Sequence, residues 1–253
     1  MIAKTQEEID GLRAAGKLLA HALRETAKLV APGVTTAALD LAAEKFIRDG
    51  GAEPAFLNYK QDGSVYPFPA SLCVSINDEV VHGIPTDERV IQDGDLVMLD
   101  LGLKLNGYFS DMAVTVTAGE GSAKDKALIA ATEEAFAKAV QAVKPGARMG
   151  DIGAAIESVA KRYGFGVVDD LGGHSLGRVA HEPPFVSNTG TVGTGIELVE
   201  GLVLAIEPIF TEGRGDIELL DDQWTFVTAD GSRSAETEGT ILITKNGAEV
   251  LTA

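Results

Sequence analysis

The chain has 253 residues, of which 45% are hydrophobic and 23% are charged. These are ordinary values for a globular protein, and a chain of this length folds without needing disulfides or a structural metal. The charge is less ordinary, because 38 acidic residues against 21 basic ones give a formal net charge of −17. Such a chain repels phosphate backbones and anionic lipid. We therefore expect neither nucleic acid nor a membrane surface as a direct partner.

Cysteine use and the first residues bear on the compartment. Cys73 is the single cysteine, which excludes an internal disulfide framework and a multi-cysteine zinc site. The first ten residues, MIAKTQEEID, lack the apolar core and the small-residue cleavage site of a secretory signal. We expect a cytoplasmic protein, and we expect it to be a monomer.

Helical and strand-like segments alternate in blocks along the chain. Thr5 and Glu8 have the spacing of a capping box, which predicts a first helix that ends before Pro32-Gly33. A second helix is predicted to end at Gly50-Gly51. The later helical periodicities lie at 123–143 and 150–163. Strand-like runs lie at 72–76, 96–103, 112–118, 202–210, 223–228 and 240–244. The order helices, strands, helices, strands indicates the α+β class.

Landmarks of the first half recur in the second half. Pro32-Gly33 and Pro145-Gly146 each precede a predicted helix, and the segment IQDGDLVMLD (91–100) resembles LVEGLVLAIE (198–207). Chance similarity between two helix–strand units is the alternative explanation. The common order favours an internal duplication within one domain, 1–253, with pseudo-repeats of roughly 1–120 and 121–253. Such a duplication naturally places a site between its halves.

Two carboxylates follow apolar runs in these similar segments. Asp100 follows four apolar residues and Glu207 follows five. Buried carboxylates are normally paired, bind a metal or lose their charge. For either residue alone, the favoured interpretation is a strand-end acid that reaches solvent or an arginine.

The turn after Asp100 gives this residue a neighbour. Asn106-Gly107 is the dipeptide favoured in two-residue hairpins. If it closes a tight turn, residue 102 faces Asp111, and Asp100 projects from the same face as residue 102. The two aspartates are then diagonal neighbours about 7–8 Å apart at Cα. Because two like charges repel at this distance, the hairpin predicts a metal site.

The remaining candidates lie in short segments that favour loops. His82, His174 and His181 each adjoin glycine or proline residues, in contexts where a rigid backbone can present a ligand or a proton carrier. Glu238 precedes a short apolar run. Taken singly, each histidine could be structural or exposed, and Glu238 could be an acid at the entry of a strand.

Taken together, these residues resemble a known family. The set that carries the resemblance, in order and in spacing, is Asp100, Asp111, His174, Glu207 and Glu238. It resembles the five-ligand dinuclear site of the pita-bread metallopeptidases, and most closely that of type I methionine aminopeptidases. The resemblance covers nearly the whole chain and includes EEIDGLRAAG, CVSINDEVVHGIP and WTFVTADGSRSAETEGTILIT. It implies a duplicated α+β fold in which helices cover an antiparallel sheet and the site lies between the halves.

The resemblance implies a metal-dependent aminopeptidase that removes N-terminal methionine from peptides and nascent proteins. Two divalent ions (Mn, Co, Fe or Zn) suit a set of four carboxylates and one imidazole. By resemblance, Asp100 binds one ion, His174 and Glu207 bind the other, and Asp111 and Glu238 bridge both. Glu207 would also take a proton from the attacking water.

Other residues match substrate-binding positions of the family. His82 and His181 match its non-ligand histidines, which position the substrate amide and stabilise the tetrahedral intermediate. Phe68, Cys73 and Trp224 match positions that line the pocket for the methionine side chain. For Trp224, ordinary core packing is the alternative.

The chain also departs from the family pattern. Ser175-Leu176 stands where Gly-Ile is usual, Ala180 replaces Phe, Phe68 replaces Tyr, and Gly239 replaces His. The missing aromatic at Ala180 predicts a wider pocket and a less strict preference for methionine. Two alternatives stay open: a related hydrolase that cleaves Xaa-Pro bonds, and a non-catalytic peptide-binding member of the family. The complete ligand set weighs against the second.

Overall fold

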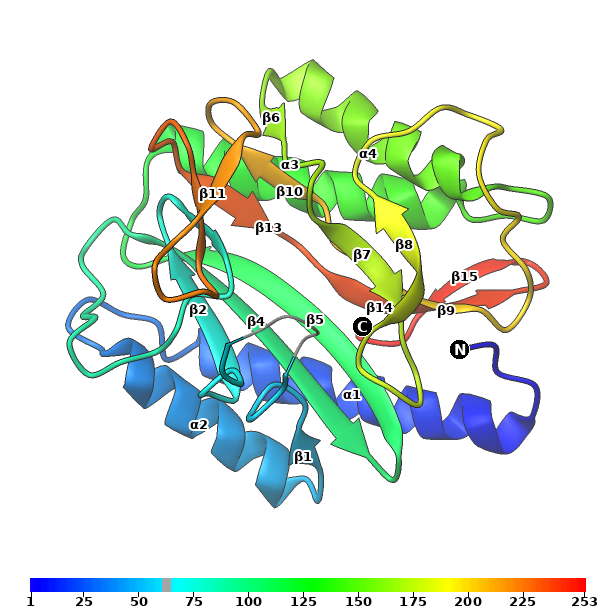
Figure 1. The fold of residues 1–253 in the computed structure, drawn as a ribbon, viewed down its shortest axis with the longest axis horizontal. Helices are drawn as coiled ribbons and strands as arrows, with labels where there is room; N and C mark the ends of the chain where they lie inside the picture. Colours follow the sequence, from blue (N-terminus) through cyan, green and yellow to red (C-terminus); the bar gives the residue numbers. More distant parts are fainter. Residues whose placement is uncertain (61–64) are drawn as a thin grey trace.

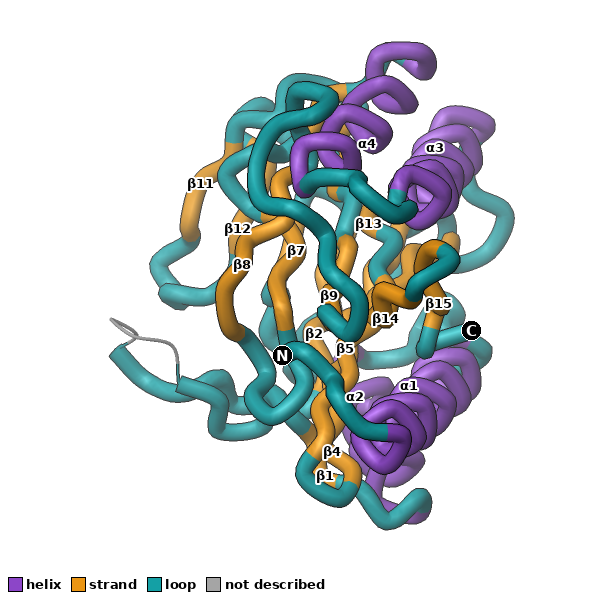
Figure 2. Tube along the Cα trace, turned by 90° about the vertical axis from the view of Figure 1, so that its right-hand side faces the viewer, coloured by secondary structure: helices purple, strands orange, loops and turns teal. Residues whose placement is uncertain are grey.

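The computed structural model describes residues 1–60 and 65–253 and confirms the predicted α+β architecture (Figure 1). Its helices are α1 Gln6–Ala27, α2 Thr36–Asp49, α3 Ala123–Ala142 and α4 Met149–Tyr163. The α1–α2 pair and the α3–α4 pair lie at opposite ends of the molecule, with strands between them (Figures 1 and 2). None of the helices in the described ranges combines the length and the hydropathy needed to cross a membrane.

Helix boundaries follow from capping groups in the sequence. At α1 the Thr5 hydroxyl accepts a hydrogen bond from the Glu8 N–H, and the Glu8 carboxylate accepts one from the Thr5 N–H, so the predicted capping box is confirmed. Ser122 and Asp125 form the same reciprocal pair at α3. α4 ends at Gly164, whose φ of 78° is left-handed and accessible to glycine at little cost. Each cap satisfies backbone groups that a helix end would otherwise leave unpaired.

All strand pairings in the described chain are antiparallel, and two larger sheets carry the site. In the first, the order is β1-β4-β2 with β5 also paired to β4; its strands are β1 Glu53–Pro54, β2 Leu72–Ile76, β4 Leu96–Leu105 and β5 Tyr108–Thr117. In the second, the order is β15-β14-β9-β7-β8; its strands are β7 Gly172–Ser175, β8 Glu182–Ser187, β9 Val203–Ile206, β14 Gly239–Thr244 and β15 Gly247–Val250.

Two smaller sheets complete the strand set. One has the order β13-β10-β6, from Ser234–Glu236, Ile209–Thr211 and Gly166–Val167. The other has the order β11-β12-β3, from Ile217–Leu219, Phe226–Thr228 and Glu79–Val81. In the side view, β11 and β12 lie on the side of the larger sheets away from the helix pairs (Figure 2).

Two predicted strands differ from the observed ones. The run 202–210 is interrupted at Glu207-Pro208 and forms β9 and β10 instead of one strand. Proline has no N–H to donate to the sheet, so the ladder stops there. The run 223–228 is a strand only from Phe226, because the Asp222 carboxylate accepts hydrogen bonds from the backbone N–H groups of Trp224 and Thr225 in a turn.

Each helix pair packs on the strands through its own hydrophobic core. In the first half, Leu19 and Leu23 of α1 pack with Leu99 of β4. In the second half, Ile156 of α4 packs with Leu204 of β9. All five side chains are fully buried, and burying one such side chain contributes roughly 1.5–3 kcal/mol. The strands that carry the candidate site residues are therefore held from behind by the two cores.

Three pairs of glycines share a backbone conformation across the predicted repeats. Gly33 has a φ of 89° and its counterpart Gly146 one of 79°. Gly51 and Gly164 have φ angles of 79° and 78°, and Gly94 and Gly201 have φ angles of 84° and 86°. These angles lie in the left-handed region that favours glycine. The match agrees with an internal duplication, and the pseudo-repeats at 1–120 and 121–253 stay a prediction.

Candidate active site

The β4–β5 hairpin brings two aspartates together. Asn106 and Gly107 have φ angles of 50° and 82°, as a type I′ turn requires. Gly102 consequently faces Asp111, which is the register predicted from the turn. Asp100 and Asp111 each offer a carboxylate oxygen to a group that also contains Glu238, with all three oxygens within 4.8 Å of one another. The predicted pairing of the two aspartates is confirmed.

The second large sheet supplies the other candidate ligands. Glu207 directly follows β9 and Glu238 directly precedes β14, and these strands pair with Gly239 opposite Ile206. The Glu238 N–H donates to the Ala113 carbonyl oxygen at 2.9 Å, which ties this acid to β5 of the first sheet. Atoms of His174, Glu207 and Glu238 all lie within 4.8 Å of one another. Glu238 thus belongs to both groups.

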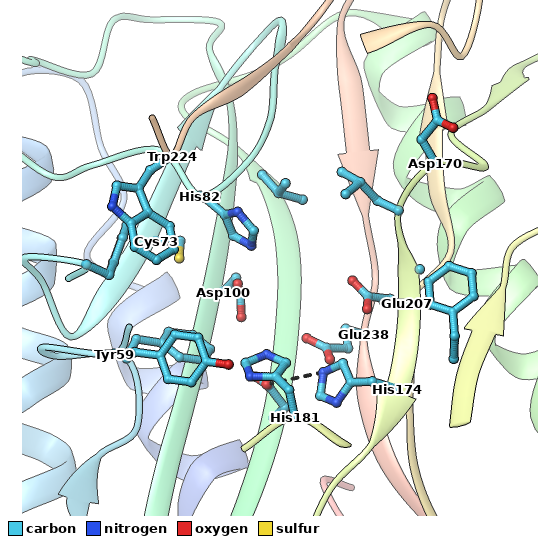
Figure 3. A pocket seen from close by; sticks show the side chains of 17 residues that line it. Tyr59, Cys73, His82, Asp100, Asp170, His174, His181, Glu207, Trp224 and Glu238 are labelled. Carbon is cyan, nitrogen blue, oxygen red and sulfur yellow. Dashed lines mark ion pairs between the residues drawn. The ribbon is translucent and has the colours of Figure 1, made fainter. Parts of the chain in front are cut away.

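The five predicted ligands converge on one cavity of about 340 Å³ (Figure 3). The residues that line it are Phe56, Tyr59, Phe68, Cys73, Val81, His82, Asp100, Asp111, Asp170, Leu171, Gly172, His174, His181, Phe185, Glu207, Trp224 and Glu238. At one end Phe68, Cys73 and Trp224 are nearly fully buried in an apolar cluster, and the Phe68 and Trp224 rings meet edge to face at 5.3 Å between centroids. The cavity therefore has a closed apolar end beside an acidic middle.

The acidic middle fits divalent cations. Burial raises the pKa of Asp100 to about 7 and the pKa of Glu207 to about 8. Burial and the nearby carboxylates raise the pKa values of Asp111 and Glu238 well above the ordinary range. Oδ1 of Asp100 is buried without a hydrogen-bond partner. Oxygen ligands with one imidazole suit Mn, Fe, Co or Zn, and bound cations would offset the repulsion among the acids.

The crowded acids predict that the metal-free protein loses stability as pH rises. Their pKa values in the folded state lie above the unfolded values of about 4, so the folded protein binds protons more tightly. Stability should therefore fall from about pH 4 through the folded pKa values of about 7 and 8. Mn²⁺ takes the place of the protons, so the gain in Tm on adding it should be larger at pH 8 than at pH 5. Equal gains at both pH values would contradict this reading.

His174 has the orientation expected of a metal ligand. Its Nδ1 lies 3.1 Å from the Ser175 carbonyl oxygen and donates to it, which leaves Nε2 free as a ligand atom 3.8 Å from Oδ2 of Asp111. Burial, with a smaller effect of His181, lowers the pKa of His174 to about 3. The imidazole is therefore neutral at pH 7, as metal binding requires.

His181 and His82 border the same space. The His181 ring centroid lies 4.3 Å from that of His174 and 4.9 Å from that of Tyr59. A third group within 4.8 Å contains Asp111, His174 and His181, so the geometry leaves His181 open as a ligand or as a hydrogen-bond donor. Burial lowers the pKa of both histidines, that of His82 to about 4.

His82 has an uncommon backbone conformation. Its φ of 58° is left-handed, which is costly for a residue with a Cβ. Its carbonyl oxygen accepts a hydrogen bond from the Thr225 hydroxyl at 3.4 Å, and its ring lies 6.1 Å from both Trp224 and Phe226. The residue lines the cavity, and backbone strain of this kind is common at functional sites.

Glu236 is a site residue that the sequence analysis missed. It is 2% exposed, its N–H donates to the Thr115 hydroxyl, and its Oε2 has no partner. Its carboxyl group interacts closely with that of Glu207. Burial, and next the Glu207 charge, raises the pKa of Glu236 well above its ordinary value. The signal in the sequence is the spacing to Glu238, because acids two residues apart share a face in extended chain.

The departures from the family pattern have local explanations. Ser175 is buried, and its hydroxyl donates to the Val203 carbonyl oxygen at 2.9 Å and accepts from the Met1 amino group. At Gly239, an added Cβ would lie 2.8 Å from the Phe136 ring, so no larger side chain fits without a shift. Ala180 is buried but does not line the cavity. The wider methionine pocket expected from Ala180 therefore stays a prediction.

Comparison with known proteins places the chain in a family. The pattern of "Metallopeptidase family M24" matches residues 10–245. The chain belongs to this family. The methionine aminopeptidase of Aquifex aeolicus is 44% identical to this M24 chain over 250 residues, which cover 98% of the chain and 97% of the relative. The crystal structure of methionine aminopeptidase from Rickettsia prowazekii matches it with a TM-score of 0.95 and 41% identity, over 100% of both chains.

A more distant structural similarity bears on the alternative of an Xaa-Pro peptidase. The prolidase from Pyrococcus furiosus matches with a TM-score of 0.77 and 28% identity over 100% of this chain, but over only 65% of the prolidase chain. The pita-bread fold predicted from the sequence is confirmed by these neighbours. Membership in a metallopeptidase family, together with the ligand groups, also confirms the predicted use of divalent metal ions.

Proposed function

We propose that this M24 enzyme is a methionine aminopeptidase, which removes N-terminal methionine from peptides and nascent proteins. The observation that carries the proposal is the pair of ligand groups that share Glu238 beside a closed apolar pocket. The relatives named methionine aminopeptidase, which are similar over nearly the whole chain, support the same activity. The Xaa-Pro alternative has weaker support, because the prolidase chain is longer and more distant.

Two divalent ions account best for the overlapping ligand groups. We assign Asp100 to one ion, His174 and Glu207 to the other, and Asp111 and Glu238 to both. The overlap in Glu238 supports neighbouring ions, and four carboxylates balance the charge of two divalent cations. When bound, such ions activate a water molecule for attack and polarise the scissile carbonyl.

The side chains around the ions then have separate tasks. The Glu207 carboxylate, ionised once its repulsion is offset, would accept the proton of the attacking water. His82 and His181 are neutral at pH 7, so each imidazole has one N–H to donate to the substrate amide or to the developing oxyanion.

The closed end of the cavity suits a methionine side chain. Phe68 and Trp224 present ring edges and faces, with which a thioether makes favourable contacts. Burial raises the pKa of Cys73, which therefore stays a neutral thiol and adds to the apolar wall. We assign these three residues to recognition of the first residue of the substrate.

A panel of peptides tests the proposed activity. Met-Ala-Ser, Leu-Ala-Ser and Ala-Pro are compared on enzyme loaded with a defined metal. We expect kcat/KM for Met-Ala-Ser to exceed that for Leu-Ala-Ser by about tenfold or more, since shape differences in an apolar pocket are worth about 1–3 kcal/mol. A preference for Ala-Pro would make the protein an Xaa-Pro peptidase. Binding without any cleavage would make it a non-catalytic peptide-binding protein.

The proposal extends to the cellular location, the oligomeric state and the partners of the enzyme. We assign it to the cytoplasm as a monomer without a direct nucleic-acid partner. The net charge of −17 supports the last point, because it disfavours approach to a phosphate backbone.

A further inference from the structure

One side of the cavity contains neither the proposed metal ligands, nor the two non-ligand histidines, nor the proposed methionine pocket. Leu171, Gly172 and Phe185 line it, together with Asp170. Figure 3 places Asp170 beyond Glu207, at the end opposite Trp224, with its carboxylate pointing away from the acidic middle. The cavity therefore continues past the candidate metal ligands toward a second, more open end.

Phe185 is held in place by its strand. It lies on β8 directly opposite His174 of β7, so the two side chains share a face of the sheet. Its ring lies over Gly172, where an added Cβ would be 3.0 Å from the ring Cζ. The side chain is nevertheless 52% exposed. A positioned aromatic ring that stays half exposed beside a site is a candidate contact for a ligand.

The arrangement of the cavity gives the direction of a bound peptide. If the first side chain occupies the closed end at Phe68 and Trp224, the scissile bond lies over the acidic middle. The chain that follows must then leave through the open end, where Phe185 and Asp170 lie. Asp170 is exposed, and no basic side chain in residues 1–60 or 65–253 forms an ion pair with it.

We propose that Leu171, Phe185 and Asp170 bind the substrate beyond its second residue and favour apolar or basic side chains there over acidic ones. This inference rests on the proposed aminopeptidase function. The Phe185 ring supplies an apolar surface for the chain. The Asp170 carboxylate attracts a cation and repels another carboxylate.

A length series tests the role of Phe185 with Met-Ala, Met-Ala-Phe-Ala, Met-Ala-Lys-Ala and Met-Ala-Glu-Ala on metal-loaded enzyme. Phe185→Ala should raise KM for Met-Ala-Phe-Ala by about three- to tenfold, because loss of one contact between aromatic rings typically weakens binding by about this factor. Its kcat/KM for Met-Ala should stay within about twofold of the parent value. Asp170→Asn should lower the ratio of kcat/KM for the Lys peptide to that for the Glu peptide. Val192→Ala, at a 75% exposed site away from the cavity, is the matched control and should change nothing.

Two results would overturn the inference. The first is that Phe185→Ala lowers kcat/KM equally for Met-Ala and for the tetrapeptides and also binds less metal. Phe185 would then only support the strand that carries His174. The other is unchanged KM for every tetrapeptide in both variants while the parent enzyme is active. If the parent enzyme releases no methionine even from Met-Ala, the proposed function itself fails.

Discussion

Glu238→Gln is expected to lose both cations and nearly all methionine release. Glu238 is the residue common to the two ligand groups, so its loss weakens both positions at once. An ion that activates water contributes several kcal/mol to the reaction, so kcat/KM should fall by about 10³-fold or more. Bound metal, measured by mass spectrometry, and kcat/KM for Met-Ala-Ser are the two readouts. Asp111→Asn should behave similarly, because Asp111 is also assigned to both ions.

Asp100→Asn is the matched control for Glu238→Gln. It removes one charge from a ligand on the β4–β5 hairpin but leaves the group of His174, Glu207 and Glu238 intact. We expect it to retain one ion and more activity than Glu238→Gln. Full metal content in Glu238→Gln, or an equal loss in both variants, would contradict the assignment of Glu238 as the shared ligand.

His174→Ala and His181→Ala should separate a ligand from a hydrogen-bond donor. The two rings lie 4.3 Å apart, and both belong to a group with Asp111, so distance alone does not assign their roles. His174→Ala should lose bound metal. His181→Ala should keep two ions and turn over about 10²–10³ times more slowly, the usual cost of removing one oxyanion donor.

Metal content beside kcat decides between these roles, and the Tm of each variant verifies that it is folded. Loss of an ion from His181→Ala would make His181 a ligand. Unchanged kcat in a folded His181→Ala would remove it from the reaction altogether.

The parts of the site that are set by local rules could be predicted from the sequence. Asn106-Gly107 fixes a two-residue turn, and the alternation of side chains along strands then places Asp100 beside Asp111. Capping residues such as Thr5 mark helix starts in the same way. These inferences need no knowledge of the remainder of the chain.

The parts that depend on long-range packing could not be predicted. β7 and β8 contain Gly172, Gly173, Pro183 and Pro184, which disfavour strands, and they form only because β9 provides a partner for β7. The contact between Glu236 and Glu207 depends on where β9 and β13 end in space. The position of Ala180 outside the cavity likewise follows from the path of the chain between β7 and β8.

A metal titration of the metal-free protein tests whether two bound ions are needed for methionine release. Apoprotein verified by mass spectrometry receives Mn²⁺ or Co²⁺ in steps, and each sample is measured for bound metal and for methionine release from Met-Ala-Ser. The assignment of the ligands predicts no activity in the apoprotein and saturation of binding at two ions per chain, with activity restored along the way. Full activity in verified apoprotein would contradict a metal-dependent enzyme. Saturation at one ion per chain, together with no loss of bound metal in Asp100→Asn, would contradict a dinuclear site.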